Sequence, residues 1–174
     1  MAEQRGKSAA GMGRAGSLSG AYEIKALIQK VNEPGFTFSK LKPEDYAPLE
    51  RFAYNVAVRK TQTKNGGKEE LEVRIKITQL RKFFAEVKRL ERGLKGRGEN
   101  QALDESFYAK LYLLHPLLAY AKGRKLIDDD FFKLMRSSLT REKLRTVKDF
   151  LTFSDFLTAV LAYSKYAGKQ EGKE

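Results

Sequence analysis

Apolar residues recur three or four positions apart along most of the chain, a spacing that places them on one face of an α-helix. The pattern predicts helices over residues 21–31, 48–59, 77–93, 101–123 and 141–167, with a further short helix after the Asp128–Asp130 run. Thr140 is the expected N-cap of the last helix, and Gly168 is expected to end it. Residues 101–123 are apolar on every side, so we expect them to form the central, buried helix, kinked at Pro116.

One segment has a different period. Leu71, Val73, Ile75 and Ile77 alternate with charged residues, and alternation of this kind indicates a half-buried strand. The run Asn65-Gly66-Gly67 just before it is a strong turn signal. The chain is therefore predicted to be all-α, a single-domain bundle of five to six helices, with a short β-hairpin or an extended insertion around residues 61–77.

The length of 174 residues, 41% of them hydrophobic, favours one domain with a real core. Residues 1–19 are rich in Gly, Ala and Ser, carry three basic side chains and have little to bury, which predicts a disordered basic tail. We expect the helical-bundle domain to occupy residues 20–168 and a second disordered tail to occupy residues 169–174.

Composition narrows the chemistry. The chain has no Cys and one His, His115, which argues against Cys-ligated metals, thiol nucleophiles and His relays. We expect no cofactor, no resident metal and no catalytic residue. The apolar runs fall short of the ~18 residues that span a bilayer, and the first residues lack the apolar stretch of a signal peptide. A cytoplasmic location without membrane contact is expected.

The formal net charge of +12 favours a polyanionic partner, and its distribution is more specific than its size. Within 77–97 there are seven basic residues against Glu86 and Glu91. On a helix, five of these cations fall in an arc of roughly 120° without an acid. They are Arg81, Lys82, Lys88, Arg89 and Arg92. A row of cations of this kind suits the phosphates of a nucleic acid, whereas an ordinary solvated face usually mixes charge signs.

Two other candidate sites are weaker. Asp128, Asp129 and Asp130 could offer oxygens to Mg²⁺, but consecutive residues at a helix start converge poorly on one ion, and N-capping explains them better. His115 has no carboxylate within a turn to orient it, which favours a structural role. Phe84, Tyr108 and Tyr163 could stack on bases, although aromatic residues at helical spacing are more often part of a core.

Four segments, in this order, resemble a known family. They are Leu41-Lys42-Pro43-Glu44-Asp45-Tyr46, Thr78-Gln79-Leu80-Arg81-Lys82-Phe83-Phe84, Leu117-Leu118-Ala119-Tyr120-Ala121-Lys122-Gly123-Arg124 and Ala162-Tyr163-Ser164-Lys165-Tyr166-Ala167-Gly168. Together they are similar to the small helical subunit of type III-A CRISPR–Cas (Csm) effector complexes. The resemblance runs from Leu41 to Lys169.

The resemblance implies a non-catalytic, RNA-binding subunit that acts in antiviral defence. Its copies would stack as a filament beside the Csm backbone subunits and the large Cas10-type subunit, along the guide RNA and the target RNA. Because guide pairing supplies sequence specificity, such a subunit would contact sugar-phosphate backbones. The candidate RNA-binding residues are Arg81, Lys82, Lys88, Arg89, Arg92, Lys122, Arg124 and Lys125.

Other interpretations stay open from the sequence. The small subunit of a type III-B or other effector complex has a comparable helical and basic character. A general RNA-binding helical protein, a bundle that binds an acidic protein, and a metal-dependent nuclease using Asp128–Asp130 are further alternatives.

Overall fold

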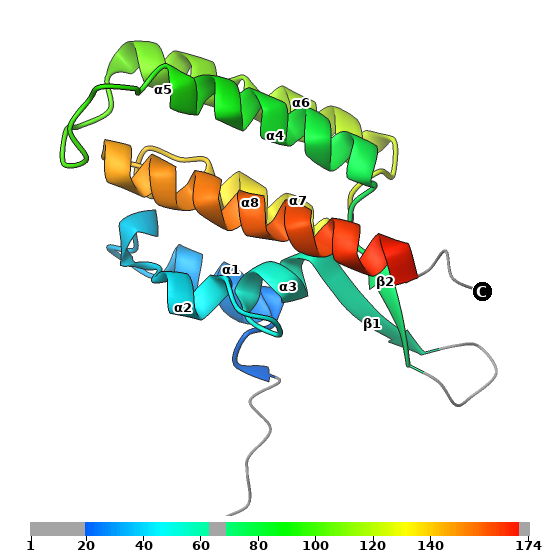
Figure 1. The fold of residues 1–174 in the computed structure, drawn as a ribbon. Coiled ribbons are helices and arrows are strands. Elements are labelled where there is room, and N and C mark those ends of the chain that lie inside the picture. The colour runs from blue at the N-terminus through cyan, green and yellow to red at the C-terminus, as the bar shows by residue number, and fades with distance from the viewer. Residues whose placement is uncertain (1–19, 63–68, 171–174) are drawn as a thin grey trace, which may run out of the picture.

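The computed structural model describes residues 20–62 and 69–170, which fold mainly as helices stacked in layers (Figure 1). The lower layer contains α1 (Ile24–Asn32), α2 (Pro43–Tyr46) and α3 (Phe52–Ala57). The middle layer contains α7 (Asp129–Ser138) and α8 (Val147–Gln170), and the upper layer α4 (Ile77–Arg92), α5 (Glu105–Tyr112) and α6 (Leu114–Gly123). The predicted all-α class is confirmed. None of the described helices is long and apolar enough to cross a bilayer.

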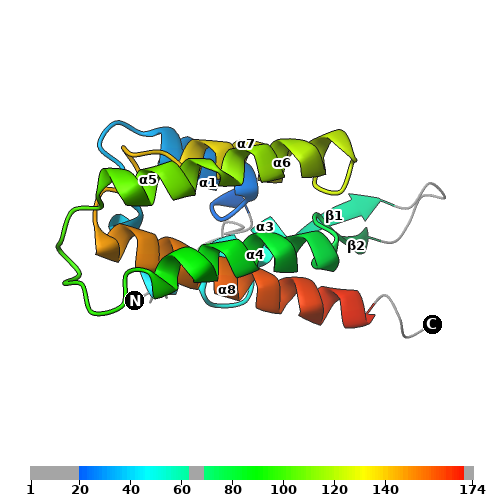
Figure 2. The ribbon, with the colours of Figure 1, turned by 90° about the horizontal axis from the view of Figure 1, so that it is seen from above.

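The central helix is α8. Its Phe150, Phe153 and Phe156 side chains are fully buried. From below, the ring of Phe38, in the short 3₁₀ turn Phe38–Lys40, packs edge-on against Phe153 with centroids 5.0 Å apart. From above, α4 packs along the length of α8, as the view in Figure 2 shows. Burial of this apolar surface is the main source of stability for the bundle.

The prediction that residues 101–123 form the central helix is wrong. The segment divides at Leu113 into α5 and α6, and both helices lie in the outer layer. Leu113, Leu117 and Tyr120 are exposed. Pro116 has no N–H to donate to the Tyr112 carbonyl, and the helix is interrupted at Leu113, one turn before the proline, in line with the predicted kink. Apolar residues on every side of a helix do not by themselves show which sides meet the core.

The N-terminus of α8 is fixed by a buried carboxylate. Thr146 precedes the helix, and the hydroxyl of Thr146 accepts a hydrogen bond from the backbone N–H of Asp149. In return, Asp149 accepts hydrogen bonds from the backbone N–H groups of Thr146 at 2.9 Å, Arg145 at 3.0 Å and Ser39 at 2.9 Å. The reciprocal bonds between Thr146 and Asp149 form a capping box. The bond from Ser39 ties the 3₁₀ turn to α8.

The expected cap at Thr140 is wrong, because α8 begins at Val147 and not at Arg141. Residues 141–143 form a turn and Thr146 forms a bridge with Ala102 before the helix. The Thr140 hydroxyl is buried without a hydrogen-bond partner among the described residues. At the other end α8 continues past Gly168 to Gln170, two residues into the predicted tail. A Cβ at Gly168 would lie 3.3 Å from the side chain of Ile77, so the glycine permits close approach of α8 to the start of α4.

The β-hairpin is present between α3 and α4. Strand β1 (Val58–Gln62) pairs antiparallel with β2 (Glu69–Val73), with Val58 opposite Val73. The predicted helix 48–59 is therefore shorter than expected, since Val58 and Arg59 belong to β1. Ile77 belongs to α4 and does not extend the strand, whereas Ile75 forms an isolated bridge with Ile127. The predicted turn at 65–67 and the predicted tail 1–19 lie outside the described residues, as do residues 171–174 of the C-terminal tail.

We predict that Asp149→Ala lowers the free energy of unfolding by about 3 kcal/mol at pH 7, because three backbone N–H groups lose a charged acceptor. Burial raises the pKa of Asp149, but its hydrogen bonds outweigh burial and hold the pKa below the ordinary value. The stabilisation is therefore complete above the unfolded-state pKa of ~3.9 and is lost as the pH falls through the folded-state pKa.

Urea denaturation at a series of pH values measures both effects. Asp149→Asn, which keeps the shape but lacks the charge, is the matched control. The difference in stability between the wild type and Asp149→Asn should shrink as the pH falls from 6 to 3. A difference that is constant over this range would contradict the role of the Asp149 charge.

Candidate nucleic-acid interface

The predicted basic arc of α4 is present, and its members differ in environment. Arg81, Lys82, Arg89 and Arg92 are exposed, whereas Lys88 is half-buried. No described carboxylate forms an ion pair with Arg81, Lys82 or Arg92. By helical geometry Arg81 and Arg92 lie within about 20° of each other, and Lys82 and Arg89 lie about 80–100° further around the helix. We refer to these four side chains as the α4 cations.

Two acidic residues border the arc more closely than the sequence suggested. The Lys88 ammonium lies 2.6 Å from the Glu91 carboxylate, which also accepts a hydrogen bond from the buried Ser154 of α8. Burial raises the pKa of Glu91, but the hydrogen bonds from Lys88 and Ser154 outweigh it and lower the pKa overall. Arg89 is paired with Glu86 at 3.1 Å, although this Arg remains exposed. Lys88 is therefore directed partly toward α8 and is the least available cation of the arc.

A groove runs between α4 and the consecutive helices α5 and α6, which lie end to end (Figure 2), and we call it the α4–α6 groove. It consists of two adjoining hollows of about 310 Å³ and about 210 Å³, and Leu117 lines both. Arg89 of α4 and Lys110 of α5 line the larger hollow, and Lys82 and Arg124 line the smaller one. The fold thus brings Arg124 beside the α4 cations, although 42 positions separate Lys82 and Arg124 in the sequence.

The three candidate cations at the end of α6, Lys122, Arg124 and Lys125, differ in their surroundings. Arg124 donates a hydrogen bond of 3.0 Å to the Tyr120 hydroxyl, and its guanidinium lies over the Tyr120 ring. Lys125 is exposed and adopts a left-handed conformation with φ of 55°. Lys122 forms an ion pair with Asp129, and the hydrogen bond from Lys122 lowers the pKa of that carboxyl group. Lys122 does not line the α4–α6 groove.

Lys122 instead lines a separate hollow, which sequence reasoning did not identify. This hairpin cleft, about 1150 Å³, opens between α1, α3, the β-hairpin and the start of α7. Cations from distant segments line it, among them Arg51, Arg59 and Lys133, together with acids that include Glu50 and Asp129. The acid-free run from Arg51 to Lys64 was a partial signal for it, but the run gives no indication of the acids that the fold brings opposite.

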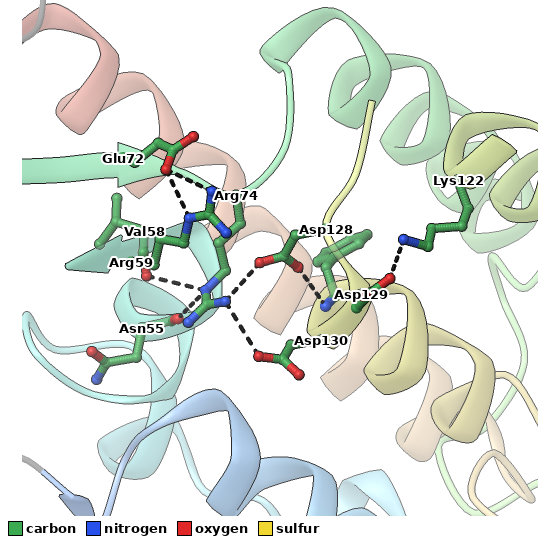
Figure 3. Close-up of polar contacts among 10 residues, drawn as sticks. Asn55, Val58, Arg59, Glu72, Arg74, Lys122, Asp128, Asp129 and Asp130 are labelled. Atoms are coloured by element: carbon green, nitrogen blue, oxygen red, sulfur yellow. Dashed lines mark hydrogen bonds and ion pairs between the residues drawn. The ribbon is translucent and has the colours of Figure 1, made fainter. Parts of the chain in front are cut away.

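Arg74 joins the walls of the hairpin cleft (Figure 3). Its guanidinium lies 2.7 Å from an Asp128 carboxylate oxygen and 3.6 Å from an Asp130 oxygen. Its Nε donates to the backbone carbonyl oxygens of Asn55 at 3.1 Å and Val58 at 3.3 Å. Only 13% of the Arg74 side chain and 16% of the Asp128 side chain are exposed. One side chain therefore fixes the end of α3, the base of the hairpin and the start of α7.

The acidic run that was considered for Mg²⁺ is held by protein groups. Asp128 is the N-cap of α7, as predicted, and accepts a hydrogen bond of 2.8 Å from the Phe131 N–H. Arg74 contacts Asp128 and Asp130, and Lys122 contacts Asp129, so the three carboxylates do not converge. In the part of the chain that the structure describes, no group of three or more His, Cys, Asp or Glu residues could hold a metal ion.

The single imidazole and the candidate stacking rings contribute to the core. His115 Nε2 lies 2.9 Å from the Leu139 carbonyl oxygen, which is a structural contact between α6 and the end of α7. Tyr108 is buried and donates to the Leu144 carbonyl at 2.9 Å. Tyr163 is half-buried and donates to the Ala47 carbonyl, and Phe84 is half-buried under Lys88. The aromatic ring that is exposed beside the groove is Tyr120, which periodicity had assigned to a buried helix.

The described residues thus form a basic helical bundle with a protruding hairpin and a row of exposed cations along α4. The model of the family described as Csm2 Type III-A matches residues 54–170, about two thirds of the chain. The protein therefore belongs to the Csm2 family, the small subunits of type III-A CRISPR complexes. The match extends from α3 to the end of α8 and favours type III-A over type III-B. The chain matches no curated protein and no solved structure.

We predict that Arg74→Ala lowers the free energy of unfolding by about 3 kcal/mol, because it leaves a nearly buried Asp128 carboxylate without its cation. Arg59→Ala is the matched control. Arg59 pairs with Glu72 at 2.6 Å at an exposed position, so its loss should cost less than about 1 kcal/mol. Chemical denaturation of both variants compares the two losses directly. Equal losses would show that Arg74 does not join the cleft walls as described.

Proposed function

We propose that this Csm2 subunit binds the sugar-phosphate backbone of guide RNA paired with target RNA through the α4 cations and Arg124. The observation that carries the proposal is the row of exposed Arg and Lys side chains along α4. From Arg81 to Arg92 the row extends about 16 Å along the helix axis, a length over which a nucleic-acid strand presents several phosphates. The net charge of +12 attracts such a polyanion from a distance.

The Arg and Lys side chains along α4 support contact with the RNA sugar-phosphate backbone in preference to recognition of the bases. Lys and Arg on a convex helix face can neutralise phosphates and release counterions, and neither step depends on sequence. In a complex in which the guide pairs with the target, base pairing supplies the specificity. The subunit then contributes affinity and register without catalysis.

The remaining candidate cations have secondary roles in this proposal. Lys88 and Lys122 are each paired with a carboxylate of the chain, Glu91 and Asp129. A phosphate must compete with these carboxylates, so the two lysines contribute less than Arg81 or Arg92. Lys125 lies exposed just after Arg124 and extends the basic surface beyond α6.

The proposed setting is a ribonucleoprotein of antiviral defence. Copies of the subunit stack as a filament along the guide and target RNAs, beside the Csm backbone subunits and the large Cas10-type subunit. Membership of the Csm2 family supports this setting, and the single-sided placement of the α4 cations suits a subunit that faces RNA on one side.

We predict that the triple variant Arg81→Glu, Lys82→Glu, Arg89→Glu weakens binding to RNA by at least about 100-fold at low salt, because several phosphate contacts become repulsive. The slope of log affinity against log salt should fall by about two to three. Fluorescence anisotropy with labelled RNA across a salt series measures both quantities, and circular dichroism checks that helicity is retained.

The matched control is the triple variant Arg136→Glu, Lys148→Glu, Lys165→Glu. It makes the same change in net charge at three exposed positions on α7 and α8. The control should lose far less affinity and keep most of the salt slope. Equal losses in the two triple variants would mean that net charge alone governs binding, and would overturn the α4 surface as the RNA-binding face.

A further inference from the structure

The α4–α6 groove has an exposed apolar wall. Leu113, Leu117 and Tyr120 follow one another on the same side of the α6 segment, and Leu113 is 67% exposed. A cluster of large apolar side chains in water is unfavourable and typically marks a surface that binds a partner. Leucine offers a base no ring to stack on, so RNA alone leaves this wall unexplained.

Basic side chains border the same groove. Lys82 and Arg89 lie on the α4 side, and Lys110 and Arg124 on the α5–α6 side. Glu86 and Asp104 also line the larger hollow, but they are already paired, Glu86 with Arg89 and Asp104 with Arg97. A groove with an apolar wall and a basic border is complementary to a partner segment that carries an apolar side chain next to a carboxylate.

The chain presents such a feature in the loop between α2 and α3. Ala47, Pro48, Leu49 and Glu50 are all exposed, and Leu49 is 53% exposed. We call these four residues the 47–50 knob. Leu49 is its apolar tip and Glu50 supplies its negative charge, and both residues also line the hairpin cleft. The nearby exposed Glu44 is paired with Lys42 at 3.8 Å.

Hydrogen bonds from neighbouring elements hold the knob in place. Tyr163 of α8 donates to the Ala47 carbonyl at 2.6 Å, and Asn55 of α3 donates to the Glu50 carbonyl at 2.8 Å. Glu50 adopts φ of 66°, a left-handed conformation that is unfavourable for a non-glycine residue and needs such support. A preorganised knob loses little conformational entropy when it docks.

The knob and the groove lie on opposite sides of α8. The knob connects α2 and α3 in the lower layer, and the groove lies between α4 and α6 in the upper layer (Figure 1). A chain cannot place its own knob in its own groove. Contact between two copies is therefore head-to-tail, and a head-to-tail contact can repeat without limit.

We propose that the 47–50 knob of one copy docks in the α4–α6 groove of the next, with Leu49 against Leu113 and Leu117 and with Glu50 facing the basic border. This inference rests on the proposed filament and identifies its interface. The small knob buries less surface than a stable dimer needs, so the contact is weak between free copies. It strengthens when RNA brings copies together, because the effective concentration rises. One Glu50 in each groove leaves most of the border cations for phosphate.

Site-specific crosslinking tests the interface, since the native chain has no Cys. The variant Leu49→Cys, Leu117→Cys is mixed with a short bismaleimide crosslinker, on a single-stranded RNA long enough for several copies. The control pair, Leu49→Cys with Tyr166→Cys, places the second thiol at an exposed site on α8 away from the groove. The 49/117 pair should give a ladder of linked oligomers, at least about tenfold more than the control pair.

A second variant separates this interface from RNA binding. Leu49→Ser removes the apolar tip of the knob at a site away from the α4 cations and Arg124. It should abolish oligomers in sedimentation on the long RNA, and its affinity for an RNA that holds one copy should be unchanged. Oligomers without the 49/117 ladder, or equal ladders from the two cysteine pairs, would overturn the knob-in-groove interface and leave RNA binding intact. Absence of oligomers from the wild type would overturn the interface as well. In that case the affinity for short RNA decides separately whether the proposed function survives.

Discussion

Burial of α8 between two layers of helices is the constraint on which the rest of the structure depends. The helix contributes Phe150, Phe153 and Phe156 to the core, so both of its sides must be covered. α3 covers one side and α4 the other. This sandwich places the basic face of α4 and the loop before α3 at opposite ends of the same stack. The capping box at Thr146 and Asp149 fixes where α8 begins, and therefore which of its residues face each layer.

Internal pairing decides which of the many cations remain available to a partner. The formal net charge of +12 is the balance of 34 basic and 22 acidic residues, and the fold pairs some of the cations with carboxylates that are distant in the sequence. Arg74 is nearly buried against Asp128 and supports the hairpin, whereas Arg81 and Arg92 remain exposed without an ion pair to any described carboxylate. The same residue type therefore serves architecture in one place and, in our proposal, RNA binding in another. The difference lies in burial and in the neighbouring acid.

Local signals in the sequence predicted much of this arrangement. The period of α4, the alternation before it and the acidic start of α7 depend on neighbouring residues. The structure confirms the helix, the N-cap at Asp128 and a strand that ends at Val73, short of Ile77. Contacts between distant segments could not be predicted in this way. The Arg74–Asp128 pair spans 54 positions, and nothing near Thr140 shows that the cap of α8 lies at Thr146. The apolar residues on every side of 101–123 likewise gave no sign that Leu113 and Leu117 are exposed.

The α4–α6 groove also depends on contacts between distant segments, so local signals in the sequence could not predict it. No single wall helix predicts a hollow by its own sequence, and the hollow exists because α5 and α6 pack beside α4. Its basic border combines residues that were predicted to bind RNA, such as Lys82, with Lys110, which was not. The structure therefore adds to the predicted surface a neighbouring apolar site.

The central claim is that the protein acts in an RNA-guided type III-A complex. Affinity purification from the native host in mild salt, with the bound RNA sequenced and the bound proteins identified, tests it most directly. The account predicts repeat-derived guide RNA together with the Csm backbone subunits and a large Cas10-type subunit. Bulk RNA without these proteins, or no RNA at all, would contradict it.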